Sequence, residues 1–337
     1  MTAPTLLPAR TVSELGERAL VARITSRLAM PDWVVVGPGD DAAVIAPERG
    51  ALDVLTTDAQ VEGVHFDRRF VPPDAIGHRA LAVNLSDLAA MGATPRAVLV
   101  SLILPDALDV AVVDGILDGL LALAARHNVV VVGGNISRTP GPMMVDVTAI
   151  GSVRARRVLT RTGARPGDSV YLTGSIGEGT VGLQSLQTAR GPAPQSCQEQ
   201  YLRPEPRVRA GMLLGRNRAA SACMDTSDGL ADAVRQIAEA SHVGLALNAD
   251  ALPIGDEVRL WHDAQGASAL GAAIGGGDDY ELLFTVRAAH RGRLRNVRRS
   301  LGDLPITHVG VVTKERRLSL HTNSGEQPLP EGFDHFR

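Results

Sequence analysis

Lysine is almost missing from this chain of 337 residues, since Lys314 is the only one and arginine supplies the other positive side chains. The nucleotide-binding P-loop needs a glycine-rich turn followed by Lys and Ser or Thr, and the protein-kinase pattern needs a lysine on a strand. Neither pattern occurs here, because Lys314 lies in a late polar stretch. If the chain handles a nucleotide, metal ions and arginine must neutralise its phosphates.

Cysteines and long apolar runs are also scarce. The two cysteines, Cys197 and Cys223, provide no disulfide framework, and we interpret them as small core or surface residues of a cytoplasmic protein. No apolar run approaches the roughly 20 residues of a membrane span, and Met1–Arg10 lacks the apolar core of a signal peptide. A formal net charge of -3 argues against nucleic acid as a partner. We therefore expect no contact with a membrane or with nucleic acid.

The composition is that of a globular protein, with 45% hydrophobic and 21% charged residues. Its length suits about two domains. The polar, arginine-rich stretch Arg154–Gly167 marks the boundary between residues 1–153 and 154–337. The helical and strand patterns predict an α+β first domain followed by a second region of α/β type, and the chain as a whole is assigned to the α+β class.

Periodicity and turn residues predict the elements of the first domain. Helices are expected at Thr11–Met30, from Asp74 as N-cap to Met91, and at Val110–Arg126, and strands at Ala51–Thr57, Ala97–Leu104, Val129–Val132 and Met144–Val153.

The same patterns extend through the second domain. Strands are expected at Ser169–Thr173, Glu281–Val286 and His308–Val312, helices at Gly179–Ala189, Arg207–Arg216, Gly229–Ser241 and Arg287–Ser300, and a loop at Gly191–Gln200. The basic helix Arg287–Ser300 is interpreted as a solvated face.

Five short segments place acidic residues where loops usually carry glycine and serine. If the fold gathers them, the carboxylates repel and raise one another's pKa, which a hard divalent cation relieves. Mg²⁺ takes oxygen ligands and is commonly shared between carboxylates and substrate phosphates. The chain is therefore predicted to be a Mg²⁺-dependent phosphate enzyme. The segments are Gly37–Asp41, Thr56–Asp58, Asn84–Asp87, Asp225–Gly229 and Gly275–Glu281.

Each segment alone also has a structural explanation. Asp40 and Asp41 suit an ordinary turn, whereas Asp58 is expected at the end of a strand, where ligands gather in α/β folds. Asn84 and Asp87 share a face of an apolar helix, where a buried carboxylate is costly without a partner. This last arrangement favours function over structure.

The remaining segments leave the choice more open. Gly133–Asn135 is expected to end a strand, either as a tight turn or as a close approach to phosphate. Asp225–Gly229 leads into a helix, where an aspartate can cap the helix and the free amides can bind an anion. His65, taken alone, is more often structural than catalytic.

In their order along the chain, these motifs resemble the thiamine-monophosphate kinase family. The resemblance covers nearly the whole chain and includes Gly39–Ala42, Thr56–Asp58, His65–Phe66, Ala82–Ala93, Gly133–Asn135, Leu159–Asp168, Asp225–Leu230, Gly276–Leu282 and Gly332–Phe336. It implies a two-domain architecture shared with aminoimidazole-ribonucleotide synthetase, in which N-terminal domains pair into a β-barrel across a homodimer. The helix motif Ala82–Ala93 and the Asp-Tyr-Glu-Leu run separate the chain from selenophosphate synthetase and other relatives.

The resemblance also implies the reaction. The γ-phosphoryl group of ATP would pass directly, in line, to thiamine monophosphate, giving thiamine diphosphate and ADP. Because the acceptor is already a phosphate, such a reaction needs alignment and relief of charge repulsion, which several Mg²⁺ ions supply.

Site residues follow by the same resemblance. Metal ligands are implied at Asp41, Thr56, Thr57, Asp58, Asp87, Asn135, Asp225 and Asp228. Contacts with ATP are implied at Gly134, Asn135, Arg161 and Ser227. Contacts with thiamine monophosphate are implied at His65, Asp278 and Phe333, the last by stacking on the thiamine rings. No nucleophile is implied.

Two positions depart from the family pattern. Asn135 stands where the family usually has Asp, so one Mg²⁺ would bind more weakly, and Asp278 replaces Glu, which changes the fit to the thiamine moiety. A non-catalytic protein that binds MgATP or thiamine phosphates is therefore one alternative. A relative with another acceptor is a second, although selenium chemistry normally wants an N-terminal Cys, and Cys197 and Cys223 lie elsewhere.

Overall fold

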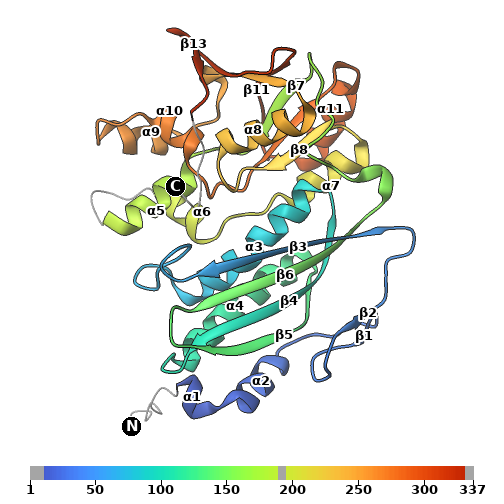
Figure 1. The fold of residues 1–337 in the computed structure, drawn as a ribbon, viewed down its shortest axis with the longest axis vertical. Coiled ribbons are helices and arrows are strands. Elements are labelled where there is room, and N and C mark those ends of the chain that lie inside the picture. Colours follow the sequence, from blue (N-terminus) through green and yellow to red (C-terminus); the bar gives the residue numbers. More distant parts are fainter. Residues whose placement is uncertain (1–10, 189–194, 331–337) are drawn as a thin grey trace. The chain divides into compact units, whose positions relative to one another are not determined.

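The protein forms two compact units (Figure 1). The structure is a computed structural model that describes residues 11–188 and 195–330. Of these, the first unit comprises 11–47, 56–84 and 96–150, and the second comprises 48–55, 85–95, 151–188 and 195–330. Among the described helices, none is both long and apolar enough to cross a bilayer.

A four-stranded sheet with the order β3-β6-β4-β5 dominates the first unit. Its strands β4 and β5 run parallel and are joined through helix α4, and helices α3 and α4 cover one face (Figure 1). The sheet and its helices are β3 (Leu52–Val61), β4 (Thr94–Pro105), β5 (Val130–Thr139), β6 (Met144–Val153), α3 (Pro73–Ala90) and α4 (Val110–His127). The smaller elements are α1 (Val12–Leu15), α2 (Glu17–Thr25), β1 (Val34–Val36) and β2 (Val44–Ile45).

Glycines let α3 and α4 approach very closely. A Cβ added at Gly77 would lie 1.7 Å from the carbonyl oxygen of Ile116, and one added at Gly119 would lie 1.7 Å from that of Asp74. Asp109 caps the start of α4, accepting a hydrogen bond of 2.8 Å from the Ala111 amide. The helix pair is thus packed backbone against backbone.

Replacing Gly77 with alanine is expected to force the two helices apart and to lower the free energy of unfolding by roughly 1–3 kcal/mol or more. Gly271→Ala is the matched control, because the nearest atom to its added Cβ is the flexible Ser268 Oγ at 3.9 Å. This control should be neutral or slightly stabilising, since alanine favours helix over glycine. Urea denaturation of both variants measures the difference, and equal effects would contradict the close packing.

The second unit is built on a seven-stranded sheet with the order β13-β12-β9-β11-β7-β10-β8. Neighbouring strands pair antiparallel except β9 and β12, which are parallel. In the centre, Leu283 of β10 lies opposite Leu172 of β7 and Met224 of β8. The strands are β7 (Ser169–Thr173), β8 (Ala222–Asp225), β9 (Gly244–Asn248), β10 (Leu282–Val286), β11 (Ile306–Thr313), β12 (Leu318–Thr322) and β13 (Gly325–Pro328).

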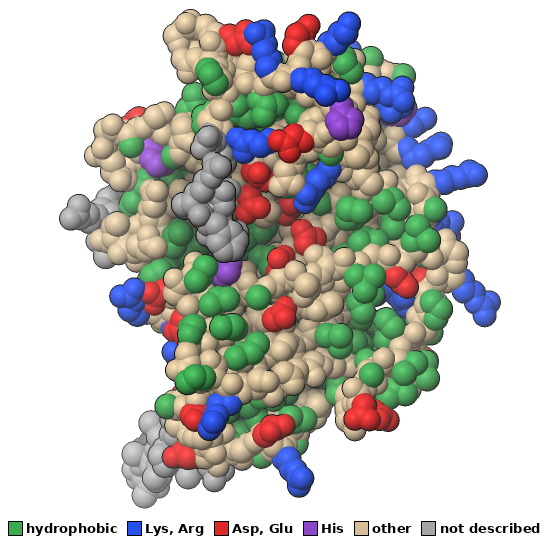
Figure 2. Space-filling view, viewed as in Figure 1, with side chains coloured by type: hydrophobic (Ala, Val, Ile, Leu, Met, Phe, Trp, Pro, Cys, Tyr) green, Lys and Arg blue, Asp and Glu red, His purple; other side chains and the backbone are tan. Residues whose placement is uncertain are grey.

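Helices flank this sheet. They are α5 (Glu178–Thr188), α6 (Gln195–Leu202), α7 (Val208–Asn217), α8 (Leu230–Ser241), α9 (Asp256–Asp263), α10 (Ala269–Gly275) and α11 (Arg291–Leu301), with a 3₁₀ turn, η1, at Ala155–Arg157. Lys and Arg side chains gather along the edge of this unit where Figure 1 places α11 (Figure 2).

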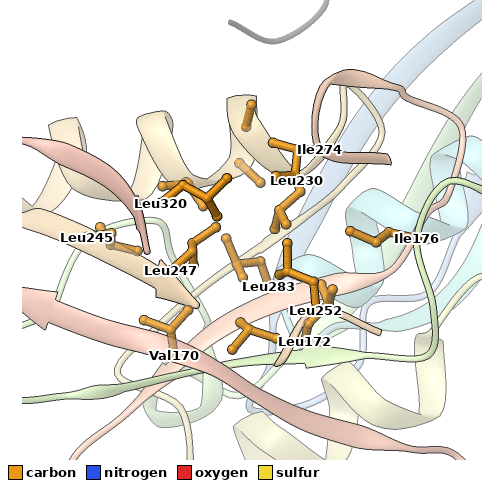
Figure 3. Packing of buried hydrophobic residues seen from close by; sticks show 14 of the residues in the cluster. Val170, Leu172, Ile176, Leu230, Leu245, Leu247, Leu252, Ile274, Leu283 and Leu320 are labelled. Atoms are coloured by element: carbon orange, nitrogen blue, oxygen red, sulfur yellow. The ribbon is translucent and has the colours of Figure 1, made fainter. Parts of the chain in front are cut away.

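The core of the second unit lies between the sheet and its helices. Leu172, Leu247 and Leu283 point from the strands toward Leu230 of α8 and Ile274 of α10 (Figure 3). All five side chains are buried.

The two cysteines confirm the core interpretation. Cys197 packs in the hydrophobic core of the second unit, and Cys223 is buried in β8. Burial first, with nearby carboxylates, raises the pKa of the Cys197 thiol to about 12. Neither thiol is therefore prepared to act as a nucleophile.

Several predicted elements differ from the structure. The helix expected at Thr11–Met30 is wrong, because Gly16 adopts a φ of 79° between α1 and α2, and α2 ends at Thr25. The loop expected at Gly191–Gln200 is wrong from residue 195 onward, where α6 begins.

Three corrections concern the acidic segments. Asp58 and Gly133–Asn135 lie inside β3 and β5 rather than at strand ends. Asp74 is within the first turn of α3 rather than before it. Gly229 is the N-cap of α8, so neither Asp225 nor Asp228 occupies the N-cap position considered for an aspartate.

Candidate active site

One edge of the second unit's sheet collects polar side chains. β7 and β8 both pair antiparallel with β10, so the ends of β7 and β8 lie beside the start of β10. This places Thr173, Asp225 and Glu281 at the same edge, with Leu282 directly opposite Asp225. We call this the acidic edge.

Asp225 is the centre of the acidic edge. Its side chain is buried, with only 3% of the residue exposed. Ser86 Oγ donates a hydrogen bond of 2.7 Å to Oδ2, and Ser227 Oγ donates a longer one of 3.4 Å to Oδ1. Ser86 belongs to the end of α3, so the helix motif and the Asp-Thr-Ser-Asp motif are brought together within this unit.

The charges around Asp225 are unbalanced. Burial, and next the negative charge of Asp87, raise its pKa to about 7. The hydrogen bond from Ser86 lowers the pKa, Asp228 raises it further, and Arg161 lowers it. Desolvation and like charge thus outweigh the favourable contacts, and a cation would relieve the repulsion.

Arg161 reaches this region from the loop that follows η1. Its Nη1 donates to Gln236 Oε1, and Gln236 Nε2 donates to Asp232 Oδ2 at 2.5 Å. Both partners lie on α8, so the guanidinium is held beside the helix. The sequence analysis did not identify Gln236 or Asp232, because both lie within α8 and outside the acidic motif that precedes this helix. Only the fold brings them to Arg161.

A buried network supports the acidic edge. Arg207 donates from Nε to Glu281 Oε2 at 2.7 Å and from Nη2 to Oε1, and Thr173 Oγ1 donates to Oε2 at 2.6 Å. The backbone amide of Glu281 donates to Thr226 Oγ1 at 3.0 Å, next to Asp225. The network fixes the backbone on both sides of the acidic edge.

The Gly-Gly-Asp-Asp-Tyr turn has an unusual backbone. Asp278 and Tyr280 have positive φ angles of 66° and 53°, and Tyr280 Oη donates to Asp278 Oδ1 at 2.8 Å. Asp279 accepts from the amides of Gly177 and Gly179 at 2.8 and 3.1 Å, at the start of α5. Non-glycine residues with positive φ cluster at functional sites. Asp278 is therefore held at a defined position within this turn.

In the first unit, the Thr-Thr-Asp segment is divided between the two faces of β3. Thr57 is exposed while Thr56 and Asp58 are half-buried, as strand alternation requires. Thr57 Oγ1 donates to Asp146 Oδ1 at 3.1 Å and shares a 3.0 Å hydrogen bond with Thr148 Oγ1. Asp146 on β6 is a carboxylate that the sequence patterns missed, because it lies in an ordinary strand.

The other predicted residues of the first unit have structural partners. Asp41 is exposed, and its backbone amide donates to Asp40 Oδ1 at 2.9 Å within a turn. His65 Nδ1 accepts from the Val61 amide at 3.1 Å.

Gly134 and Asn135 lie side by side in β5. A Cβ at Gly134 would lie 1.9 Å from the carbonyl oxygen of Val100 on β4, so strand packing alone requires glycine there. Asn135 is exposed, and its Nδ2 donates to Ser137 Oγ at 3.0 Å. Phe333 lies outside the described residues.

The donors at the acidic edge suit a hard cation. Carboxylate and hydroxyl oxygens are the ligands that Mg²⁺ takes, and it usually retains waters and substrate phosphates as further ligands. Among the described residues, no group of three His, Cys, Asp or Glu side chains is close enough to hold a metal ion alone. The buried, negatively surrounded Asp225 fits an ion that is completed by phosphate rather than enclosed by protein.

Comparison with known proteins assigns the chain to a family. The models named AIR synthase related protein, N-terminal domain and C-terminal domain, match residues 39–153 and 165–323. The chain is 34% identical to thiamine-monophosphate kinase of Bacillus subtilis (strain 168), over 96% of this chain and 100% of that protein. It is 37% identical to the Escherichia coli (strain K12) enzyme of that name, over 95% and 98%. The chain belongs to the thiamine-monophosphate kinase family.

Solved structures agree with this family. Thiamine-monophosphate kinase from Stenotrophomonas maltophilia K279a superposes with a TM-score of 0.79 at 36% identity, covering 89% of this chain and 95% of that one. AaThiL complexed with AMPPCP and TMP gives a TM-score of 0.76 at 30% identity, covering 98% and 100%. The hydrogenase maturation protein HypE in complex with ATP, at 20% identity and a TM-score of 0.77, covers 95% and 96% and shares the fold alone. The resemblance to the thiamine-monophosphate kinase family and the two-domain α+β architecture are thus confirmed.

Proposed function

We propose that this chain transfers the γ-phosphoryl group of ATP directly to thiamine monophosphate, giving thiamine diphosphate and ADP. The observation that carries the proposal is its full-length similarity to thiamine-monophosphate kinases, one of which is described as bound to AMPPCP and TMP. The acidic edge supports it, because a site without a strong base suits an acceptor that is already a phosphate.

The metal ligands in this proposal are the oxygen donors that the family resemblance implies. In the second unit they are Asp87, Asp225 and Asp228; the carboxylate of Asp225 is buried, and the charges of the other two raise its pKa. In the first unit they are Asp41, Thr56, Thr57, Asp58 and Asn135. When bound, Mg²⁺ supplies charge neutralisation between donor and acceptor phosphates.

The chain's own residues bind and orient the nucleotide. Arg161, held by Gln236, offers its remaining guanidinium donors to phosphate oxygens. Ser227 offers a hydroxyl at the start of α8, and Gly134 with Asn135 offers exposed strand backbone.

Recognition of thiamine monophosphate is assigned to His65, Asp278 and Phe333. Asp278 is oriented by Tyr280 Oη, so its carboxylate is fixed although its side chain is one carbon shorter than the usual Glu. A fixed carboxylate suits the cationic thiazolium ring.

Residues 1–153 are assigned to ATP and Mg²⁺ binding and to dimerisation, and residues 154–337 to the C-terminal domain. The proposed homodimer pairs two four-stranded sheets into a β-barrel. In support, β3 leaves alternate residues exposed, and among them Leu55 is 67% exposed. The two unpaired, buried cysteines fit the reducing cytosol as the site of the reaction.

The decisive experiment mixes the purified protein with ATP, Mg²⁺ and thiamine monophosphate and follows thiamine diphosphate by chromatography. Asn135→Asp is assayed beside it, because this change restores a charge at a position where the Asn side chain donates a hydrogen bond to Ser137 Oγ. We expect turnover by the parent and a lower Mg²⁺ requirement in the variant.

Other outcomes point to the alternatives. If only Asn135→Asp turns over, the parent is a non-catalytic protein that binds MgATP or thiamine phosphates. If neither protein turns over while both fold, the acceptor is wrong and the substrates of related synthetases are tested next.

A further inference from the structure

A second polar feature lies at the opposite end of the same strands. Ser221 precedes β8 and Arg287 follows β10, and Thr285 lies opposite Ala222 in the sheet. At roughly 3.3 Å per strand residue, Ser221 is about 13 Å from Asp225. This end of the sheet is therefore separate from the acidic edge.

A pocket of about 410 Å³ opens there. Of the described residues, no Asp or Glu lines it. Its charged or titratable lining residues are Arg156, Arg157, Arg218, Arg287, His290 and Arg293. They come from η1, the end of α7, the end of β10 and the start of α11. We call this the basic pocket.

Few negative charges face the cations of the basic pocket in the part of the chain that the structure describes. Within the described residues, none of its five arginines forms an ion pair. Arg287 Nε and His290 Nδ1 are buried and have no hydrogen-bond partner there either. Arg293 Nη1 donates to the Arg218 carbonyl oxygen at 3.0 Å, which fixes one guanidinium but leaves its charge unbalanced. Like charges held together without partners are costly, so an anion would relieve this pocket.

The pKa of His290 is lowered, by burial and in part by the positive charges of the arginines around it. Burial lowers its pKa first, and Arg293, Arg287 and Arg218 lower it further, whereas Asp168 raises it. Asp168 is not among the lining residues, and it accepts hydrogen bonds from Ser221 Oγ at 2.7 Å and from the Arg165 amide at 3.1 Å. The single carboxylate nearby is thus already engaged.

We propose that the basic pocket binds a small anion with two or more phosphate groups, at a site separate from the acidic edge. Arginine presents a planar fork that matches phosphate oxygens, and five forks exceed what one phosphate group can use. The volume falls within the roughly 300–1,000 Å³ of small-molecule sites. None of the described residues that line the pocket is a carboxylate that could hold a metal ion, so we expect binding without Mg²⁺.

The test titrates the full-length protein with inorganic phosphate, pyrophosphate and triphosphate in EDTA at low salt, by calorimetry. We expect affinity to rise with the number of phosphates. Arg287→Gln combined with Arg293→Gln should weaken triphosphate binding by about tenfold or more, since each charge-assisted contact is strong. Arg295→Gln is the matched control, because Arg295 is exposed on α11 outside the pocket, and it should change affinity less than about twofold.

The pKa of the His290 imidazole provides a second measurement of anion binding, and it can be made on the parent protein without a variant. An anion in the pocket offsets the arginines, so triphosphate should raise the pKa of His290 in an NMR titration of the parent protein. Three results would overturn the proposal: no triphosphate binding in EDTA, equal weakening by Arg295→Gln, or phosphate binding as tightly as triphosphate. An unmoved His290 signal on binding would place the anion elsewhere.

Discussion

Asp225→Asn is expected to abolish thiamine diphosphate formation while making the metal-free protein more stable. The carboxylate is buried beside Asp87 and Asp228, and its neutral isostere removes the repulsion but still accepts the hydrogen bond from Ser86. Removing a buried, poorly compensated charge should raise the free energy of unfolding by about 1–3 kcal/mol. Mg²⁺ should then raise the melting temperature of the parent but not of the variant.

The stability gained by Asp225→Asn should depend on pH, and the raised pKa of Asp225 gives the direction of that dependence. Because the pKa of Asp225 is raised to about 7 in the folded protein, the contribution of this group to stability is fully present below the ordinary carboxyl pKa near 3.8 and is lost as pH rises through 7. The gain from Asp225→Asn in EDTA should therefore be larger at pH 8 than at pH 5. Asp303→Asn, an exposed change, serves as the control. A variant that keeps its activity, or that is less stable at pH 8, would contradict the assigned role.

Arg207→Met is expected to be among the most destabilising single changes in the second unit. It leaves Glu281, whose side chain is only 2% exposed, without its cation. Breaking a buried pair by removing one partner typically costs about 3–5 kcal/mol. Arg317→Met, which breaks the exposed pair with Glu326, should cost less than about 1 kcal/mol. Thermal and urea unfolding measure both.

Adding Glu281→Gln to Arg207→Met separates charge from packing. If the buried charge causes the loss, the double variant recovers a large part of the stability, because glutamine can still pair with Thr173. No recovery would show that the arginine acts mainly through its packing.

The sequence predicted those elements whose residues repeat a pattern over a sufficient length. Met144–Val153 and Ser169–Thr173 are strands with the predicted bounds. The helix expected at Val110–Arg126 is one residue longer and ends at His127. The strand Ala222–Asp225 was missed because it has four residues and ends in a buried aspartate that suggests a loop. Its strand character comes from pairing with β10, which lies far away in sequence.

The sequence identified many residues of the candidate site, but it did not show which of them contact one another. Aspartates and serines of the motifs were identified, and Ser86 and Asp225 were both within motifs, yet they are 139 residues apart. Arg207, the partner of Glu281 across 74 residues, lies in no motif. Such pairs depend on strand order, which a local pattern does not encode. Asp58 and Asn135 were placed at strand ends because apolar periodicity stops before their strands do.

Strand order in the second unit also governs when that unit can form during synthesis. β7 lies between β10 and β11, and its Thr173 side chain bonds the amide of Leu282, 109 residues later. A ribosome-bound chain that has emerged only through α8 contains β7, whose five residues are all buried in the folded protein, before either neighbouring strand has been made. Pairings of such sequence separation form slowly. The nascent chain therefore carries this strand without its neighbours until Leu282, 109 residues after Thr173, has been synthesised, and an unpaired strand of this kind favours aggregation and chaperone binding during translation.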